Sequence, residues 1–335
     1  MPCRGIHMSF TTVERIPPRP NRSQLFVPGV RPQLIDKAVA GDADVITLDL
    51  EDSVAPADKP QARANVIEAL KTKNFGNKSI SVRINGLDTP YCYRDVVDIL
   101  EQAGERLDLI MIPKVGVAAD VYAIDMLITQ IETAVRRKKQ LKLEVIIESV
   151  LGLNNIDAIA GSSKRLESLH FGSADYAASA GMRTTNIGGP NKDYVVLTDK
   201  DAAGNRDQHW SDLWHYATFR MVAAARAHGL RPIDGPFGDY SDEAGFIAQA
   251  QRTAVLGCEG KWAIHPSQVA LANRVFTPPA EEIERAEAIL AAMKDGQDKG
   301  MGAVSLGGKL IDLASIRQAE VIVRQMQMIR ERTKG

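Results

Sequence analysis

Short apolar segments alternate with helical segments through most of this chain, and that alternation limits the fold it can adopt. Eight runs rich in Val, Ile, Leu and Phe are each followed by a segment with helical apolar spacing. Such alternation predicts a parallel sheet with right-handed crossovers, and eight units predict a (β/α)8 TIM barrel. The strands are expected within residues 22–29, 43–52, 78–86, 107–116, 141–149, 166–175, 230–239 and 260–266.

The barrel is expected to occupy residues 21–277, between two segments of different character. Residues 1–20 are rich in Pro and Arg and lack the apolar core of a signal peptide, which predicts a flexible N-terminal arm. Residues 278–335 hold two helical segments around a Gly-rich stretch. This pattern predicts a C-terminal helical appendage that acts as a lid, over its own barrel or over a neighbour's. Periodicity is also lost between residues 176 and 210, as is typical of an active-site loop.

The composition favours a small-molecule partner in a reducing compartment. The 41 basic and 42 acidic residues nearly balance, so no global field points to nucleic acid or to a membrane surface. No apolar run approaches the roughly 18 residues needed to cross a bilayer. The three cysteines, Cys3, Cys92 and Cys258, have no paired spacing, which argues against a disulfide framework and a thiolate metal site. We therefore expect a soluble, cytoplasmic protein.

Two acids end neighbouring predicted strands. Glu148 lies near the end of the strand at 141–149 and Asp175 at the end of the segment 166–175, with a short helix expected between them. Parallel neighbours about 4.8 Å apart would place both carboxylates on the carboxyl-terminal rim, where α/β folds bind ligands. Such a hard-ligand pair suits Mg²⁺. The alternative is that the two acids cap helices or form surface ion pairs.

Other charged residues share the predicted rim. Asp49 and Asp52 could orient metal-bound waters, or they could pair with Lys59 or Lys114. Arg83 ends an apolar strand, where its permanent charge needs a partner, either a nearby acid or a substrate anion.

Several other signals are weaker. Lys114 could form a Schiff base if its amine were unprotonated, but an acidic rim would keep it protonated. His265 also lies at a predicted strand end, where a lone histidine is more often a hydrogen-bonded structural residue than a catalyst. The glycines match neither a P-loop nor a dinucleotide-binding fingerprint.

An ordered set of motifs resembles a known family. The motifs are RSQLFVPG, LDLEDSVAPADK, VRINGLDTPYCYRD, MIPKVG, EVIIES, FGSADYA and KWAIHPSQ. Together they resemble the citrate lyase β-subunit and HpcH/HpaI aldolase superfamily, and within it the malyl-CoA/β-methylmalyl-CoA lyases. The likeness extends from about Arg22 to the last helix.

The resemblance implies a reversible carbon–carbon cleavage that depends on Mg²⁺, with Mn²⁺ as a substitute. (S)-malyl-CoA would give acetyl-CoA and glyoxylate, and β-methylmalyl-CoA would give propionyl-CoA and glyoxylate. The resemblance makes Glu148 and Asp175 the metal ligands. It also implies that the backbone amides of Ala174 and Asp175 hold the glyoxylate carboxylate and that Arg83 stabilises the thioester oxygen.

The same resemblance implies that the site is shared between subunits. Asp312, in KLIDLAS, matches an acid/base that reaches in from a neighbouring subunit, which implies a homotrimer or homohexamer. Arg31 and Lys37 lie six apart on one predicted helix, so they need not face the same way. The further substrate contacts that the resemblance implies are Phe26, Arg31, Lys37, Ile264 and His265.

Three other functions are compatible with these motifs. A thioesterase on the same scaffold would use the metal site to hydrolyse malyl-CoA to malate and CoA. A citryl-CoA lyase subunit would need carrier-protein partners. A CoA-ester-binding protein without activity would need no combination of Arg83, Glu148, Asp175 and Asp312.

Overall fold

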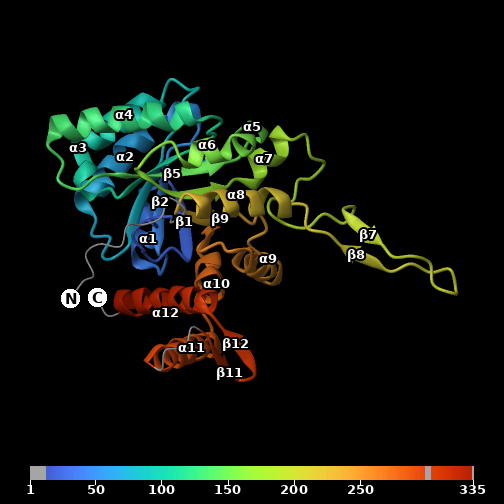
Figure 1. The fold of residues 1–335 in the computed structure, drawn as a ribbon. Coiled ribbons are helices and arrows are strands. Elements are labelled where there is room, and N and C mark those ends of the chain that lie inside the picture. Colours follow the sequence, from blue (N-terminus) through green and yellow to red (C-terminus); the bar gives the residue numbers. More distant parts are fainter. Residues whose placement is uncertain (1–12, 299–302, 334–335) are drawn as a thin grey trace.

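A closed barrel of eight parallel strands forms the body of the protein (Figure 1). The structure is a computed structural model that describes residues 13–298 and 303–333. The strand order around the barrel is β1-β10-β9-β6-β5-β4-β3-β2, so the first and last barrel strands pair and close the sheet. The barrel strands are β1 (Ser23–Pro28), β2 (Val45–Asp49), β3 (Ser79–Arg83), β4 (Leu109–Ile112), β5 (Lys142–Ile147), β6 (Leu166–Phe171), β9 (Arg231–Asp234) and β10 (Gly260–Ala263).

Amphipathic helices cover the outside of the barrel. In α3, Val96, Ile99 and Leu100 are buried at helical spacing while the opposite face is open to solvent. The segment expected as one short helix at 150–165 forms two, which meet at Asn155. The barrel helices are α1 (Pro32–Ala40), α2 (Lys59–Thr72), α3 (Cys92–Ala103), α4 (Ala118–Val135), α5 (Val150–Asn154), α6 (Ile156–Ala160), α7 (Ser173–Ser179), α8 (His215–Ala227), α9 (Glu243–Leu256) and α10 (Ser267–Val275), with 3₁₀ turns η1 (Pro56–Asp58) and η2 (Gly104–Arg106).

The predicted (β/α)8 barrel is therefore confirmed, and its parallel strands all point their carboxyl ends to one rim. Within the described residues, none of the helices is both long enough and apolar enough to span a bilayer. Cys92 and Cys258 are buried free thiols, and Cys3 lies outside the described residues.

Two hairpins were not expected from the sequence. The long loop after α7 contains β7 (Val195–Leu197) and β8 (Gln208–Trp210), an antiparallel pair that projects away from the barrel (Figure 1). The Gly-rich stretch near the C-terminus contains β11 (Val304–Leu306) and β12 (Lys309–Ile311). Gly307 and Gly308 form the two-residue turn of that second hairpin with φ of 56° and 76°, a conformation that favours glycine.

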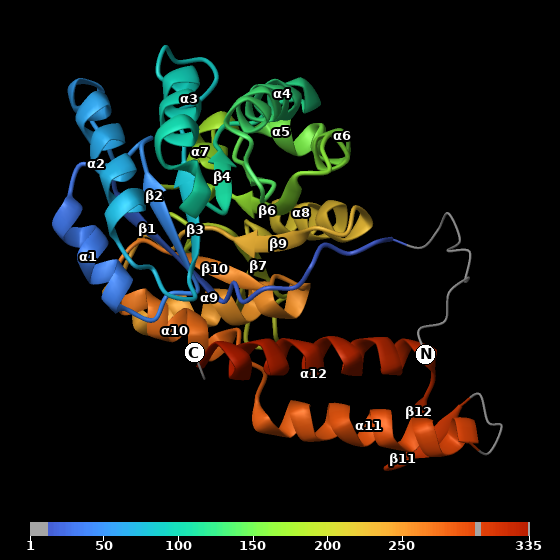
Figure 2. The ribbon, with the colours of Figure 1, turned by 90° about the vertical axis from the view of Figure 1, so that its left-hand side faces the viewer.

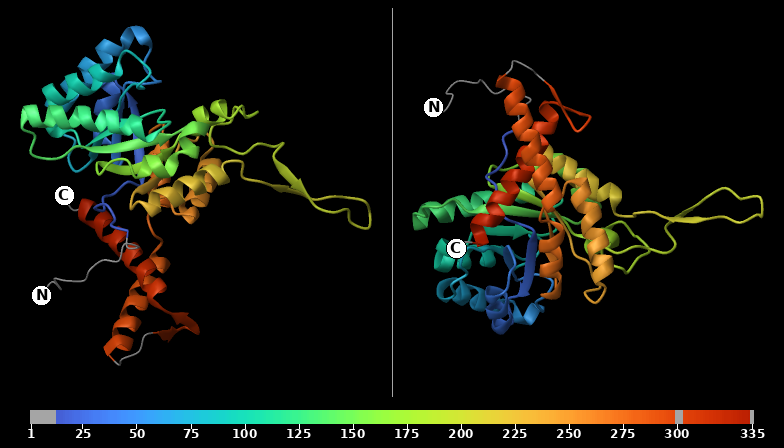
Figure 3. Two further views of the ribbon diagram at one scale, coloured as in Figure 1. Left: turned by 45° about the horizontal axis from the view of Figure 1, so that its top comes forward. Right: turned by 90° about the horizontal axis from the view of Figure 1, so that it is seen from below.

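The C-terminal extension lies at the end of the barrel away from that rim. Helices α11 (Ala280–Asp298) and α12 (Leu313–Thr333) run side by side beneath the barrel (Figures 2 and 3) and share a small apolar core. Gln325 donates to the Phe276 carbonyl at 2.9 Å, and Arg332 pairs with Asp44, which precedes β2. The extension of this chain therefore lies at the amino-terminal end of its own barrel, and its predicted role as a lid remains to be tested.

The segment before β1 contacts the same end of the barrel. The backbone N–H of Ile16 donates to the Gly229 carbonyl at 3.1 Å, and Arg19 pairs with Glu167 at 3.0 Å. The flexibility predicted for residues 1–20 stays a prediction, since residues 1–12 lie outside the described part of the chain.

A buried carboxylate organises the interior of the barrel. Glu144, on β5, is fully buried and accepts hydrogen bonds from Gln24 at 2.9 Å and from Ser81 at 2.7 Å. Arg19 reaches it at 3.3 Å and His170 at 3.5 Å. Burial alone would raise the pKa of Glu144, but contact with His170, Arg19 and Ser81 overcomes burial and lowers it to about 2. The carboxylate thus links strands that lie far apart in the sequence.

We expect Glu144→Gln to lower the free energy of unfolding at pH 7 by ~3 kcal/mol, because Arg19 would keep its charge and lose this partner. The ionised carboxylate stabilises the fold at pH values above the ordinary pKa of glutamate, 4.5. That stabilisation is lost as the pH falls through the lowered pKa of Glu144, about 2. The difference between variant and parent should therefore narrow below pH 4.5. Urea unfolding at several pH values measures it, with the exposed Glu68→Gln as control. Equal stability of parent and Glu144→Gln at pH 7 would contradict this role.

Candidate active site

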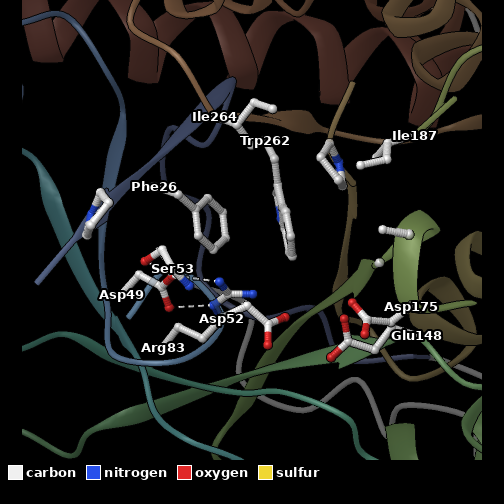
Figure 4. A pocket seen from close by; sticks show the side chains of 14 residues that line it. Phe26, Asp49, Asp52, Ser53, Arg83, Glu148, Asp175, Ile187, Trp262 and Ile264 are labelled. Carbon is white, nitrogen blue, oxygen red and sulfur yellow. Dashed lines mark hydrogen bonds and ion pairs between the residues drawn. The ribbon is translucent and has the colours of Figure 1, made fainter. Parts of the chain in front are cut away.

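A pocket of about 270 Å³ opens at the carboxyl ends of the barrel strands (Figure 4). Its lining divides into a charged part and an apolar part. The charged residues are Asp49, Asp52, Arg83, Glu148 and Asp175. The apolar side chains are Phe26, Pro28, Ile187, Pro236, Trp262 and Ile264.

Glu148 lies one residue beyond β5 and is 3% exposed. Its carboxylate accepts a hydrogen bond from the backbone N–H of Lys114 at 2.7 Å. Burial and the nearby charge of Asp175 raise the pKa of Glu148 to about 8. A carboxylate in this position is costly to ionise unless a cation compensates its charge.

Asp175 approaches Glu148 from the next strand unit. It lies in the first turn of α7, directly after β6, and β5 and β6 are parallel neighbours as predicted. The two carboxylates lie side by side on one wall of the pocket (Figure 4). No group of three or more His, Cys, Asp or Glu placed to hold a metal ion occurs among the described residues. Two carboxylates with room for water and substrate oxygens nevertheless fit the way that Mg²⁺ is usually held.

Gly172 makes this arrangement sterically possible. A Cβ atom at this position would lie 2.5 Å from both the Cβ and the Oε2 of Glu148. Any side chain here would therefore force Glu148 to move.

Arg83 lies across the pocket from the acid pair and is held by acids of its own (Figure 4). Its Nε and Nη2 donate to the two carboxylate oxygens of Asp49, both at 2.6 Å, and its Nη1 lies 3.0 Å from Glu51. Although burial opposes the charge, Asp49 and Glu51 raise the pKa of Arg83 above its usual value. A guanidinium has five N–H groups, so two of them remain to bind a substrate oxygen. Arg83 can therefore keep its contacts with the nearby acids and still bind a substrate oxygen.

Lys114 connects the two sides of the site. Its Nζ binds Glu51 at 2.5 Å and Asp52 at 3.2 Å, and its backbone adopts φ of 53°, a left-handed conformation unusual for lysine. Burial opposes its charge, but Glu51 and Asp52 raise the pKa of Lys114. The ammonium therefore stays protonated, which disfavours a Schiff-base role. Lys59 instead donates to backbone carbonyls in the segment after β2.

Several substrate contacts implied by the sequence lie on or near the pocket. Phe26, Ala174 and Ile264 line it. His265 lies just outside, exposed, with its ring stacked on Tyr240 at 4.6 Å between ring centroids.

The remaining predicted residues lie elsewhere. Arg31 precedes α1, Lys37 lies in its last turn, and both are exposed. Asp312 precedes α12 and is exposed, and among the described residues none that follows Ile264 lines the pocket. The site of a single chain is therefore formed without Asp312.

Sequence reasoning missed Trp262, Ile187 and Gly172. The signal for Trp262 was present, because it lies two residues before Ile264 in the segment expected as the last strand, where alternate residues share a face. Ile187 comes from the long loop, where no periodicity could place it.

The fold and the pocket together define a TIM-barrel protein with a two-carboxylate site at the carboxyl ends of its strands. The family model for HpcH/HpaI aldolase/citrate lyase matches residues 22–266. The chain therefore belongs to the HpcH/HpaI aldolase/citrate lyase family, as the order of motifs predicted.

Individual relatives agree with this family. The L-malyl-CoA/beta-methylmalyl-CoA lyase of Cereibacter sphaeroides is 59% identical over 322 residues, which cover 96% of this chain and 99% of that protein. The malyl-CoA/beta-methylmalyl-CoA/citramalyl-CoA lyase of Chloroflexus aurantiacus is 38% identical over 95% of this chain and 91% of its own length. CitE from Mycobacterium tuberculosis, in complex with magnesium, acetoacetate and coenzyme A, is 25% identical with a TM-score of 0.68, covering 92% of this chain and 98% of that one.

We expect Gly172→Ala to weaken Mg²⁺ binding by about 10–100-fold, because the new methyl group would displace Glu148. Isothermal titration calorimetry with MgCl₂ measures the affinity. Gly41→Ala is the matched control, since a Cβ there meets its neighbours only at 3.5 Å or beyond. Unchanged Mg²⁺ affinity in folded Gly172→Ala would show that the position of Glu148 does not matter for the metal.

Proposed function

We propose that this protein is a Mg²⁺-dependent lyase that reversibly cleaves (S)-malyl-CoA to acetyl-CoA and glyoxylate, and β-methylmalyl-CoA to propionyl-CoA and glyoxylate. The single observation that carries the proposal is the convergence of Glu148, Asp175 and Arg83 on one pocket. Support also comes from relatives named for these substrates, with 59% and 58% identity over 96% of this chain.

Glu148 and Asp175 are the proposed metal ligands, with Mn²⁺ as a substitute for Mg²⁺. When bound, the ion would supply Lewis-acid polarisation and a fixed platform for the oxygens of glyoxylate. Ala174 and Asp175 lie in the first turn of α7, where backbone N–H groups have no partner within the helix. We assign these two amides to the glyoxylate carboxylate.

Arg83 is the proposed stabiliser of the thioester oxygen. Cleavage removes the proton from the hydroxyl group, and the carbon that carried this group becomes the aldehyde carbon of glyoxylate. The electrons of the broken C–C bond move to the thioester part of the substrate. Negative charge thus accumulates on the thioester oxygen as the enolate forms, and a proton then adds to its carbon. Asp49 and Glu51 fix the guanidinium before the reaction, so little reorganisation is needed.

Asp312 is the proposed acid/base, contributed by a neighbouring subunit. It accepts hydrogen bonds from the backbone and side chain of Ser315, and these bonds lower its pKa. Asp312 is therefore an ionised carboxylate at neutral pH. Because the extension lies at the far end of its own barrel, we propose that it closes the pocket of another chain in a homotrimer or homohexamer.

The coenzyme A part of the substrate would extend out of the pocket. Phe26, Ile264 and His265 are proposed to contact the acyl end of the thioester. Arg31 and Lys37 are exposed cations near the two ends of α1 and are proposed to bind CoA phosphates. These partners are small metabolites, and we also propose a cytoplasmic location.

We expect Glu148→Gln and Asp175→Asn to lose Mg²⁺-dependent cleavage of malyl-CoA by at least about 10²-fold while circular dichroism shows an intact fold. Glyoxylate is trapped as a hydrazone while free CoA is followed in parallel. The control is Asp239→Asn, an exposed acid outside the pocket. Full activity in EDTA would contradict the proposal, and free CoA without glyoxylate would identify a thioesterase instead.

Mixing two inactive variants tests the shared site. Asp312→Asn keeps an intact barrel pocket, whereas Glu148→Gln keeps an intact Asp312. If Asp312 acts in a neighbouring subunit, unfolding and refolding the two variants together should restore part of the activity that each lacks. Mixed oligomers with no more activity than either variant alone would contradict a site shared between chains.

A further inference from the structure

A buried hydrogen bond to His170 holds the indole of Trp262 in place in the pocket wall. Its indole Nε1 donates to Nδ1 of His170 at 2.8 Å. His170 is fully buried on β6, and Trp262 is 4% exposed on β10. These strands are not neighbours, so the bond crosses the interior of the barrel.

The hydrogen bonds also determine which nitrogen of His170 carries the proton. An indole N–H can only donate, so Nδ1 of His170 must accept and the ring proton lies on Nε2. Nε2 lies 2.8 Å from Ser168 Oγ, which in turn donates to Glu144 at 3.3 Å. A chain of hydrogen bonds thus extends from the buried Glu144 to the indole in the pocket.

The indole forms part of the pocket wall next to the reacting groups. Its ring centroid lies 4.2 Å from that of Phe26, and the Phe26 centroid lies 5.3 Å from Cζ of Arg83. Figure 4 shows Trp262 extending between Phe26 and the acid pair. Met111, Ile146 and Ile233 pack behind it. The wall therefore cannot retreat without disturbing the core.

The two proposed substrates differ at a single place. β-Methylmalyl-CoA carries one additional methyl group, on the carbon next to the thioester carbonyl. If Arg83 binds the thioester oxygen, this carbon lies close to the guanidinium. The Phe26 ring beside Arg83 and the Trp262 ring packed against Phe26 are then the apolar surface available to the methyl group.

We propose that Trp262 is the specificity-determining wall that limits the size of the acyl group, and that His170 is the positioning residue that fixes the indole. This inference rests on the proposed lyase function and deepens it. One additional methylene in an apolar pocket changes specificity by about 10–200-fold, which is enough to decide between acetyl-CoA and propionyl-CoA.

The first test compares the condensation of glyoxylate with acetyl-CoA and with propionyl-CoA. Trp262→Phe should raise the ratio of kcat/KM for propionyl-CoA over acetyl-CoA at least about tenfold, because the smaller ring leaves room for the methyl group. Trp210→Phe, in the projecting hairpin, is the matched control and should leave the ratio unchanged. An unchanged ratio in active Trp262→Phe would overturn the role of Trp262.

The second test separates the bond from the bulk of His170. Asn at position 170 retains an oxygen near the place of Nδ1, whereas Leu removes the acceptor. The chain has three tryptophans, and the indole N–H signal of Trp262 in an NMR spectrum is identified by its loss in Trp262→Phe. In His170→Leu, the indole proton of Trp262 should exchange with solvent faster than in the parent, and the ratio of kcat/KM should shift toward propionyl-CoA. In His170→Asn, the exchange rate and the ratio should both resemble those of the parent.

Each remaining outcome has one meaning. A parent-like indole signal and ratio in His170→Leu would overturn the positioning role of His170. Failure of the parent protein to condense glyoxylate with either acyl-CoA would overturn the proposed function, and this inference with it. Because the parent protein is assayed first, failure of the function is distinguishable from failure of the specificity wall.

Discussion

An excess of acidic side chains in one pocket is the constraint on which the candidate site depends. Four carboxylates and one guanidinium line it, namely Asp49, Asp52, Glu148, Asp175 and Arg83. Arg83 compensates Asp49 through two short hydrogen bonds. Among the described residues, Glu148 has only the backbone N–H of Lys114 as its hydrogen-bond donor. The charges of Arg83 and Asp49 thus compensate each other, whereas the pair of Glu148 and Asp175 lacks a compensating cation in the described part of the chain. A divalent ion would complete it, and the same ion would fix a substrate oxygen opposite Arg83.

The barrel separates the tasks of stability and chemistry between its two ends. The amino-terminal end and the interior hold the Arg19–Glu144 pair and the contacts of the C-terminal extension. The carboxyl-terminal end holds the pocket. The hydrogen bonds of Glu144, Ser168, His170 and Trp262 connect the two regions. The part of the pocket wall formed by Trp262 is therefore supported from the core of the barrel.

The features that could be predicted from the sequence are those set by apolar periodicity and strand direction, namely the barrel and the rim at which strand ends meet. Glu148 and Asp175 could be placed together because parallel neighbours must share a rim, and the structure brings them together. The partners of Arg83 were left open, since only the register of β2 against β3 sets Asp49 beside it. The hairpin of β7 and β8 lay in a segment without periodicity. The position of Asp312 could not be predicted, because the extension packs against residues far away in the chain, as in the pair of Arg332 with Asp44. Roles of individual residues still rest on the site and not on the fold.

Anomalous X-ray diffraction from crystals grown with MnCl₂ is the most direct test of the central claim. We expect one strong manganese peak within bonding distance of a carboxylate oxygen of both Glu148 and Asp175, on the side of the pocket opposite Arg83. The metal is expected to complete its coordination with water or substrate oxygens. Density for solvent alone at these two carboxylates, with no manganese peak under conditions that support activity, would contradict the proposed metal site.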